Sequence, residues 1–184
     1  MLAHTPNILT ILRVVLTVVA IAIIPFAPVN LYTYLLGIFI VAALTDFLDG
    51  YIARRFSIES DFGKIFDPLS DKVLTFVFLV ILYPTGVIAP TVILLLIVRD
   101  LVVDGVRASL ASYTVIPAIF TAKVKTTLIF LLIISALIEL SVGTSSILHQ
   151  VTVLLSAAAL VFAYVSATQY AQLFYRAYQS RTSE

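Results

Sequence analysis

The chain has 184 residues, of which 61% are hydrophobic and 11% charged, and its formal net charge is only +1. With a mean hydropathy of +1.13, this composition excludes an ordinary water-soluble domain and indicates a membrane protein. The absence of cysteine excludes disulfides and thiolate metal sites, so any metal ion would be held by oxygen ligands.

Long apolar runs predict an all-α, polytopic fold with six transmembrane helices. Each run approaches the roughly 20 residues that cross a bilayer, and lipid tolerates no unpaired backbone groups. No internal repeat or low-complexity linker interrupts the chain, so we expect a single domain over residues 1–184. The expected spans are 8–28, 32–54, 67–84, 88–111, 125–141 and 147–174.

Basic residues are distributed unequally between the two sides of this arrangement. The connections near 29–31, 85–87 and 142–146 contain no Lys or Arg. The other connections and the tail contain Arg54, Arg55, Lys64, Arg107, Lys123, Lys125, Arg176 and Arg181. Because loops rich in Lys and Arg stay in the cytoplasm, we predict that both termini face the cytoplasm and that the protein resides in the cell membrane.

Three charged or titratable residues stand apart from the main pattern. Arg13 lies inside the first apolar run, where it either extends toward the membrane surface or meets an acid such as Asp46, with a role near a bound nucleotide as the alternative. Glu139 and His149 are predicted near the outer side, and the sequence assigns them no role.

Acidic and small residues recur at fixed intervals between residues 46 and 71. At about 100° per residue they fall on two helical stripes, one on each of two successive spans. The first stripe holds Asp46, Asp49, Gly50 and Ala53, and the second holds Gly63, Asp67 and Asp71. Antiparallel neighbours can direct all four carboxylates into one gap, where their mutual repulsion and burial favour bound divalent cations. Carboxylate ligands with room for substrate phosphates are typical of Mg²⁺ and Mn²⁺ sites.

The small residues of this segment predict close approach by a phosphorylated ligand. Gly50, Ala53 and Gly63 lack bulky side chains, so a ligand can lie against the helix backbone, and Arg54 can reach a phosphate from the side. In the alternative interpretation the acids only pair with nearby basic residues at the membrane surface. That alternative explains neither the small residues nor the regular spacing of the acids. The basic residues concerned are Arg54, Arg55, Lys64 and Lys72.

The complete pattern D-x2-D-G-x2-A-R-x8-G-x3-D-x3-D resembles the signature of the CDP-alcohol phosphatidyltransferases. It is met by Asp46, Asp49, Gly50, Ala53, Arg54, Gly63, Asp67 and Asp71. The resemblance implies a six-helix membrane enzyme, commonly a homodimer, that transfers a phosphatidyl group from a CDP-linked lipid to an alcohol and releases CMP. It further implies that the four aspartates hold two divalent ions and that Asp71 is the catalytic base. The CDP-lipid would contact Asp49, Gly50, Ala53, Arg54 and Gly63.

Basic residues near the fourth and fifth spans predict a site for a phosphate-bearing acceptor, since Arg and Lys donate to anionic oxygens. The candidates are Arg99, Arg107, Lys123 and Lys125. The alternative makes Arg99–Asp104 or Asp100–Arg107 structural ion pairs and treats the lysines as ordinary cytoplasmic-side residues.

The same region carries a second resemblance. Its layout is similar to that of phosphatidylglycerophosphate synthases, as is the opening TPNILTILR, and those enzymes transfer from CDP-diacylglycerol to glycerol 3-phosphate. The layout comprises Arg99, Asp100, Gly105, Arg107, Lys123, Lys125 and Thr126. Open alternatives are another acceptor (inositol phosphate, inositol or serine) or an ether-lipid donor. A divalent-cation transporter is a more distant one, disfavoured because no repeat is present.

Overall fold

The computed structural model describes the backbone of residues 5–26, 28–56, 61–111 and 119–182. Within these ranges, the side chains that lie outside the description are those of 5–8, 46–56, 61–65, 67–68, 110–111, 176–178 and 180–182.

Six α-helices and two short 3₁₀ turns make up the described chain, which contains no strand. The helices are α1 (Thr5–Ile23), α2 (Leu31–Phe56), α3 (Asp61–Leu82), α4 (Pro90–Ala111), α5 (Phe120–Val142) and α6 (Ser146–Thr182), and the turns are η2 (Ile24–Phe26) and η3 (Tyr83–Thr85). The predicted all-α fold is confirmed, and each predicted span overlaps one helix.

Three stretches of the described chain are long and apolar enough to cross a membrane. They are Leu9–Phe26, Phe120–Val142 and Ser146–Tyr175. Many large apolar side chains on α1, α4 and α6 face outward, including Val18, Val98 and Val161. An apolar exterior of this kind suits contact with lipid rather than water, so the chain is a membrane protein.

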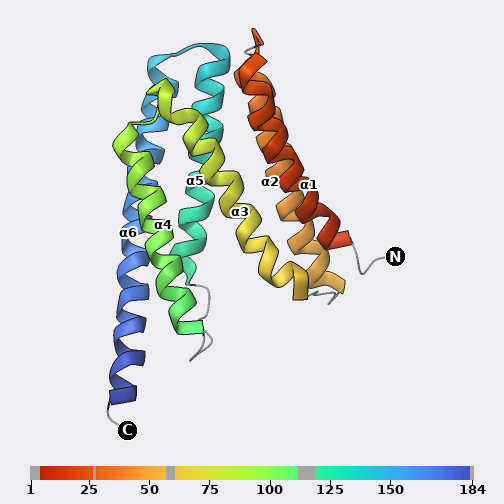
Figure 1. Ribbon diagram of the computed structural model, residues 1–184. Helices are drawn as coiled ribbons and strands as arrows, with labels where there is room; N and C mark the ends of the chain where they lie inside the picture. Colours follow the sequence, from red (N-terminus) through yellow and green to blue (C-terminus); the bar gives the residue numbers. More distant parts are fainter. Residues whose placement is uncertain (1–4, 27, 57–60, 112–118, 183–184) are drawn as a thin grey trace.

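The helices run up and down, so that their connections alternate between the two ends of the bundle (Figure 1). The α1–α2, α3–α4 and α5–α6 connections lie at one end, and both termini lie at the other. Helix α1 packs on α2 and α3, α5 packs on α2 and α6, and α4 packs on α6. Helix α5 therefore joins the α1–α3 side of the bundle to the α4–α6 side.

Local sequence sets several helix boundaries. Pro90 opens α4, a position where its missing N–H has no intrahelical partner to lose. Ser145 caps α6, because its Oγ accepts the Leu148 N–H at 3.2 Å. Gly143 ends α5 with φ of 100° and donates its N–H to the Glu139 carbonyl at 3.1 Å, and residues with side chains rarely adopt such a φ.

The apolar core is continuous through the bundle. Phe39 of α2 contacts Phe78 of α3 and Phe130 of α5, with ring centroids 4.8 and 5.3 Å apart. On α6, Ala159 and Ala163 are fully buried, and small residues at a four-residue spacing let neighbouring helices approach closely.

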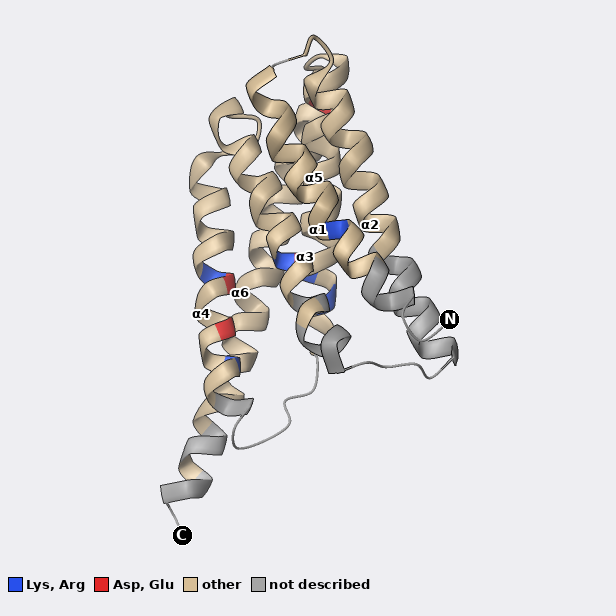
Figure 2. Cartoon of the chain, turned by 45° about the vertical axis from the view of Figure 1, so that its right-hand side comes forward, with Lys and Arg blue, Asp and Glu red and all other residues tan. Residues whose placement is uncertain are grey.

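Charged residues lie from the middle of the bundle toward the end that holds the termini, as Figure 2 shows for the described residues. The exception is Glu139, which lies in the last turn of α5 near the α5–α6 connection. The two ends of the bundle thus differ chemically in the way that the distribution of basic residues predicted.

Candidate active site

The aspartate pattern lies on two helices that follow one another in the chain. Asp46, Asp49, Gly50, Ala53 and Arg54 fall in the second half of α2, and Gly63, Asp67 and Asp71 fall in the first half of α3. The structure describes the side chain of Asp71 alone among these, so the convergence of four carboxylates remains a prediction.

Asp71 lies beside a buried arginine from α1. The Arg13 side chain has 0% exposure and its Nη1 donates to Asp71 Oδ1, while the Asp71 side chain is 31% exposed. The same Nη1 donates to Ser70 Oγ at 2.8 Å. Arg13 therefore does not extend toward the membrane surface as one expectation had it. It meets an acid, and the acid described is Asp71, the predicted base.

Two of the predicted acceptor-binding residues form a buried ionic cluster between α4, α5 and α6. Arg99 Nη1 and Lys125 Nζ lie 2.6 and 2.7 Å from oxygens of Asp100. Arg99 also donates from Nε to the Ala163 carbonyl at 2.7 Å and from Nη2 to Ser166 Oγ at 2.6 Å. Two cations thus share one carboxylate, and each of the three guanidinium nitrogens of Arg99 has a partner.

The other two predicted acceptor residues are more accessible. Arg107 is exposed and its Cζ lies 5.5 Å from the ring centroid of Tyr170 on α6, a cation–π contact that leaves its N–H groups available. Lys123 is exposed on the first turn of α5.

Lys72 and Asp104 form an ion pair that links α3 to α4. Each side chain is about one-third exposed, at 34% and 32%. The alternative ion pairs considered from sequence, Arg99–Asp104 and Asp100–Arg107, are replaced by Lys72–Asp104 and Arg99–Asp100. The described ion-pair partner of Lys72 is thus Asp104 on α4.

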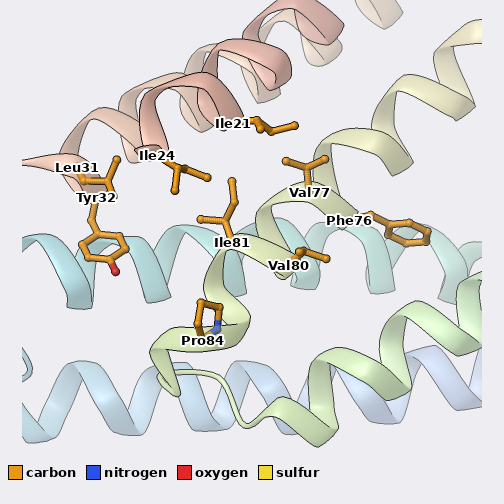
Figure 3. A pocket seen from close by; sticks show the side chains of 9 residues that line it. All are labelled: Ile21, Ile24, Leu31, Tyr32, Phe76, Val77, Val80, Ile81 and Pro84. Carbon is orange, nitrogen blue, oxygen red and sulfur yellow. The ribbon is translucent and has the colours of Figure 1, made fainter. Parts of the chain in front are cut away.

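An apolar groove lies between α1, α2 and α3 in the half of the bundle away from the termini (Figure 3). Its volume is about 540 Å³. The lining residues are Ile21, Ile24, Leu31, Tyr32, Phe76, Val77, Val80, Ile81 and Pro84. Along α1 and α3, the lining residues of this groove come after Arg13 and Asp71. The groove therefore lies further along the same α1–α3 contact, the α1–α3 seam, as the ion pair between these two residues.

A polar contact joins α5 to α6 near the apolar end. Glu139 is 1% exposed and accepts from Thr152 Oγ1 at 3.0 Å, and His149 Nδ1 lies 3.0 Å from its other oxygen. Ser135 and Thr152 hydroxyls are 2.9 Å apart. These partners explain how a buried acid is tolerated at Glu139, which sequence left without a role.

Residues 3–165 match the family model described as CDP-alcohol phosphatidyltransferase. The chain belongs to the CDP-alcohol phosphatidyltransferase family. The match extends from α1 into α6 and so includes both the aspartate segment and the basic cluster.

Several curated relatives of this phosphatidyltransferase share a name. A protein of Rickettsia felis named CDP-diacylglycerol–glycerol-3-phosphate 3-phosphatidyltransferase is 38% identical over 126 residues, which cover 67% of this chain and 68% of the relative. Proteins with the same name from Cereibacter sphaeroides and Bacillus subtilis are 39% and 38% identical. The first covers 66% of this chain and 58% of the relative, and the second 48% and 47%.

The predicted donor set of this family member would suit hard divalent cations. Four aspartates offer only oxygen, and the chain has no cysteine, a combination that favours Mg²⁺ or Mn²⁺ over softer metals. Among the side chains that the structure describes, no three potential ligands lie together. Asp71 is the only one of the four aspartates in that set.

Proposed function

We propose that this protein transfers the phosphatidyl group of CDP-diacylglycerol to glycerol 3-phosphate, yielding phosphatidylglycerophosphate and CMP. The observation that carries the proposal is the identity of 38% over two-thirds of the chain to a relative named for this reaction. The separation of an acidic segment on α2 and α3 from a basic cluster on α4 and α5 supports it. One region suits metal-bound diphosphate, and the other suits an anionic acceptor.

Asp46, Asp49, Asp67 and Asp71 are the residues that would hold two Mg²⁺ or Mn²⁺ ions. When bound, such ions neutralise the charge of the diphosphate and of the leaving group. On the protein side, Gly50, Ala53 and Gly63 would leave room for the CDP moiety beside Asp49, and Arg54 would donate to its phosphate.

Asp71 is proposed as the base. The hydroxyl oxygen of the acceptor forms a bond to the phosphorus that carries diacylglycerol, and the bond from that phosphorus to the oxygen of CMP breaks. The hydroxyl proton passes to an Asp71 carboxylate oxygen. The charge on the departing CMP is stabilised by Arg54, and the electron count balances because CMP leaves with the bonding pair.

The acceptor phosphate is assigned to Arg107 and Lys123, because both are exposed. Lys125 uses two contacts on Asp100, at 2.9 and 2.7 Å, and an ammonium has three donors, so one remains for a phosphate oxygen. Arg99 is the weakest of the four candidates, since its nitrogens already have partners inside the bundle.

The lipid tails are assigned to the groove in Figure 3. A predominantly apolar lining between membrane helices suits acyl chains. Its place beyond Asp71 on the α1–α3 seam would let the tails lie in the membrane while the diphosphate stays near the aspartates.

The arrangement in the membrane is also a proposal: six spans, both termini and the active site on the cytoplasmic face of the cell membrane, and a homodimeric assembly as the family resemblance implies. A cysteine at Ser145 should react with an impermeant reagent added outside intact cells. One at Ser180 should react only after permeabilisation, and the reverse pattern would overturn the orientation.

The function is tested by offering the purified protein CDP-diacylglycerol with glycerol 3-phosphate, inositol phosphate, inositol or serine and measuring CMP release. We expect release with glycerol 3-phosphate and little with the others. Release with a different acceptor would retain the reaction class and change the substrate, and no release with any acceptor would refute the proposal. Replacing the ester donor by an ether analogue would show whether the linkage of the lipid matters.

A further inference from the structure

The residue that the reaction scheme leaves unused is Arg13. It lies on α1 within the apolar stretch Leu9–Phe26 and is fully buried. A charge at such a position costs several kcal/mol on insertion scales unless it is paired, and a guanidinium cannot shed its proton to avoid that cost. The contacts of the Arg13 side chain therefore explain why a buried charge is tolerated at this position.

The described contacts of the Arg13 side chain are directed at two consecutive residues of α3. Nη1 donates to Ser70 Oγ at 2.8 Å and to Asp71 Oδ1. Asp71 is also tied to its own helix, because Thr75 Oγ1 donates to the Asp71 carbonyl at 3.0 Å. The carboxylate is thus approached by a fixed cation whose orientation is set by a neighbouring hydroxyl.

We propose that Arg13 is a positioning residue for catalysis, holding the Asp71 carboxylate through Oδ1 in the orientation in which it takes the proton of the acceptor. This inference rests on the proposed function. Each carboxylate oxygen has more than one lone pair, so the contact from Arg13 to Oδ1 does not by itself prevent the carboxylate from accepting a proton. Ser70 contributes by fixing the guanidinium.

Positioning and mere structural support lead to different kinetics. If Arg13 orients the base, its loss lowers turnover with little change in either KM, because the lost interaction matters in the transition state. Small misplacements of a catalytic group cost up to about a hundredfold. If Arg13 only packs α1 against α3, its loss lowers stability, and the folded fraction turns over normally.

The test compares Arg13→Met, Arg13→Lys and Ser70→Ala with the control Thr17→Val. Thr17 is a buried polar residue one turn from Arg13, and its hydroxyl donates to the Arg13 carbonyl at 2.8 Å. The control therefore removes a polar group from the same helix without touching the side-chain contact. For each protein, CMP release is measured with both substrates varied, and folding is measured by thermal unfolding.

We expect kcat to fall roughly tenfold to a hundredfold in Arg13→Met, with both KM values within about threefold of the parent protein. Arg13→Lys should recover part of the loss, because an ammonium keeps the charge without the planar fork. Ser70→Ala should lose a fewfold in kcat, and Thr17→Val should match the parent.

A folded Arg13→Met protein with parental kcat would overturn the inference, as would an equal loss in Thr17→Val. If neither Arg13 variant folds, Ser70→Ala decides the matter, and parental kcat in that variant would likewise overturn it. Failure of the parent protein to release CMP with any acceptor refutes the proposed function instead, so the two failures are distinguishable.

Discussion

Arg13 on α1 and Arg99 on α4 are both buried, but their carboxylate partners occupy different places in the chain. The partner of Arg13 is Asp71, 58 residues away on α3. The partner of Arg99 is the adjacent Asp100, and its other contacts are a main-chain carbonyl and a hydroxyl of α6. The first pair joins a cation to the acid predicted to do chemistry, whereas the second belongs to a cluster in which two cations share one carboxylate.

This difference indicates that the two sides of the bundle have different roles. On the α4–α6 side, Asp100 pairs with both Arg99 and Lys125. These ion pairs stabilise the packing of the helices, and because two cations share one carboxylate, a net positive charge remains. On the α1–α3 side, the four aspartates of the signature lie within 26 residues of sequence, and the described part offers Arg13 as one compensating cation. We infer that the α1–α3 side performs the phosphoryl chemistry and that the α4–α6 side receives the acceptor.

The largest expected effect comes from removing divalent cations, which should act on the α1–α3 side alone. Exhaustive chelation should abolish CMP release, and added Mg²⁺ or Mn²⁺ should restore it. The same ions should raise the unfolding temperature by ligand-binding linkage, and Asp67→Asn should reduce that rise.

Glu139→Gln is the matched control, because it removes a carboxylate at the opposite end of the bundle. This variant should keep the full response of the unfolding temperature to the cations. Undiminished activity of the parent protein after chelation would remove the metal mechanism.

Exchanging one carboxylate on each side should give opposite outcomes. Asp71→Asn removes the base and should lower kcat by roughly a thousandfold or more at saturating acceptor. It should lose less stability than Asp100→Asn, because the Asp71 side chain is 31% exposed and its amide oxygen can still accept from Arg13. Asp100→Asn should instead lower stability, by about 3 kcal/mol, since breaking a buried pair leaves its cations uncompensated.

Initial rates and thermal unfolding on the two carboxylate variants check this contrast. A normal kcat for Asp71→Asn would contradict the role of the base. An Asp100→Asn protein as stable as the parent would contradict the structural role of the α4–α6 cluster.

A smaller effect is expected from filling the apolar groove. Val80→Trp should raise KM severalfold for a CDP-lipid with long acyl chains and leave KM for a dioctanoyl donor unchanged, because only long tails extend along the seam. Val161→Trp on α6 is the control, since the two valines are 59% and 60% exposed and Val161 lies outside the groove. Equal KM values for the two donor lengths in Val80→Trp would place the tails elsewhere.

The sequence predicted the number and order of the described helices, because a long apolar run in a membrane protein favours a helix. It placed several ends too close to the apolar centre: α3 begins at Asp61 rather than 67, α5 at Phe120 rather than 125, and α6 continues to Thr182. Hydropathy detects the part of a helix that avoids water, while the backbone hydrogen bonds continue into polar sequence.

The residues of the candidate site could be named from the sequence. The contacts that the described ones make could not. Fixed spacing identified Asp71, because helical periodicity places it one turn after Asp67. The partner of Arg13 depended on how α1 packs against α3, which no local pattern encodes. The pairing of Arg99 and Lys125 with Asp100 likewise required the packing of α4, α5 and α6.

The division of labour between the two sides is tested most directly by steady-state kinetics of Arg107→Ala and Lys123→Ala, with CMP release followed while both substrates are varied. Ser109→Ala, which removes an exposed polar group from the same stretch of α4, is the control. We expect each basic variant to lose roughly tenfold to a hundredfold in kcat/KM for glycerol 3-phosphate, equivalent to one charge-assisted contact of about 1.5–3 kcal/mol. The KM for CDP-diacylglycerol should stay within about threefold of the parent value. Normal glycerol 3-phosphate kinetics in both variants would contradict the account and would assign these residues to the ordinary positive charges of the cytoplasmic face.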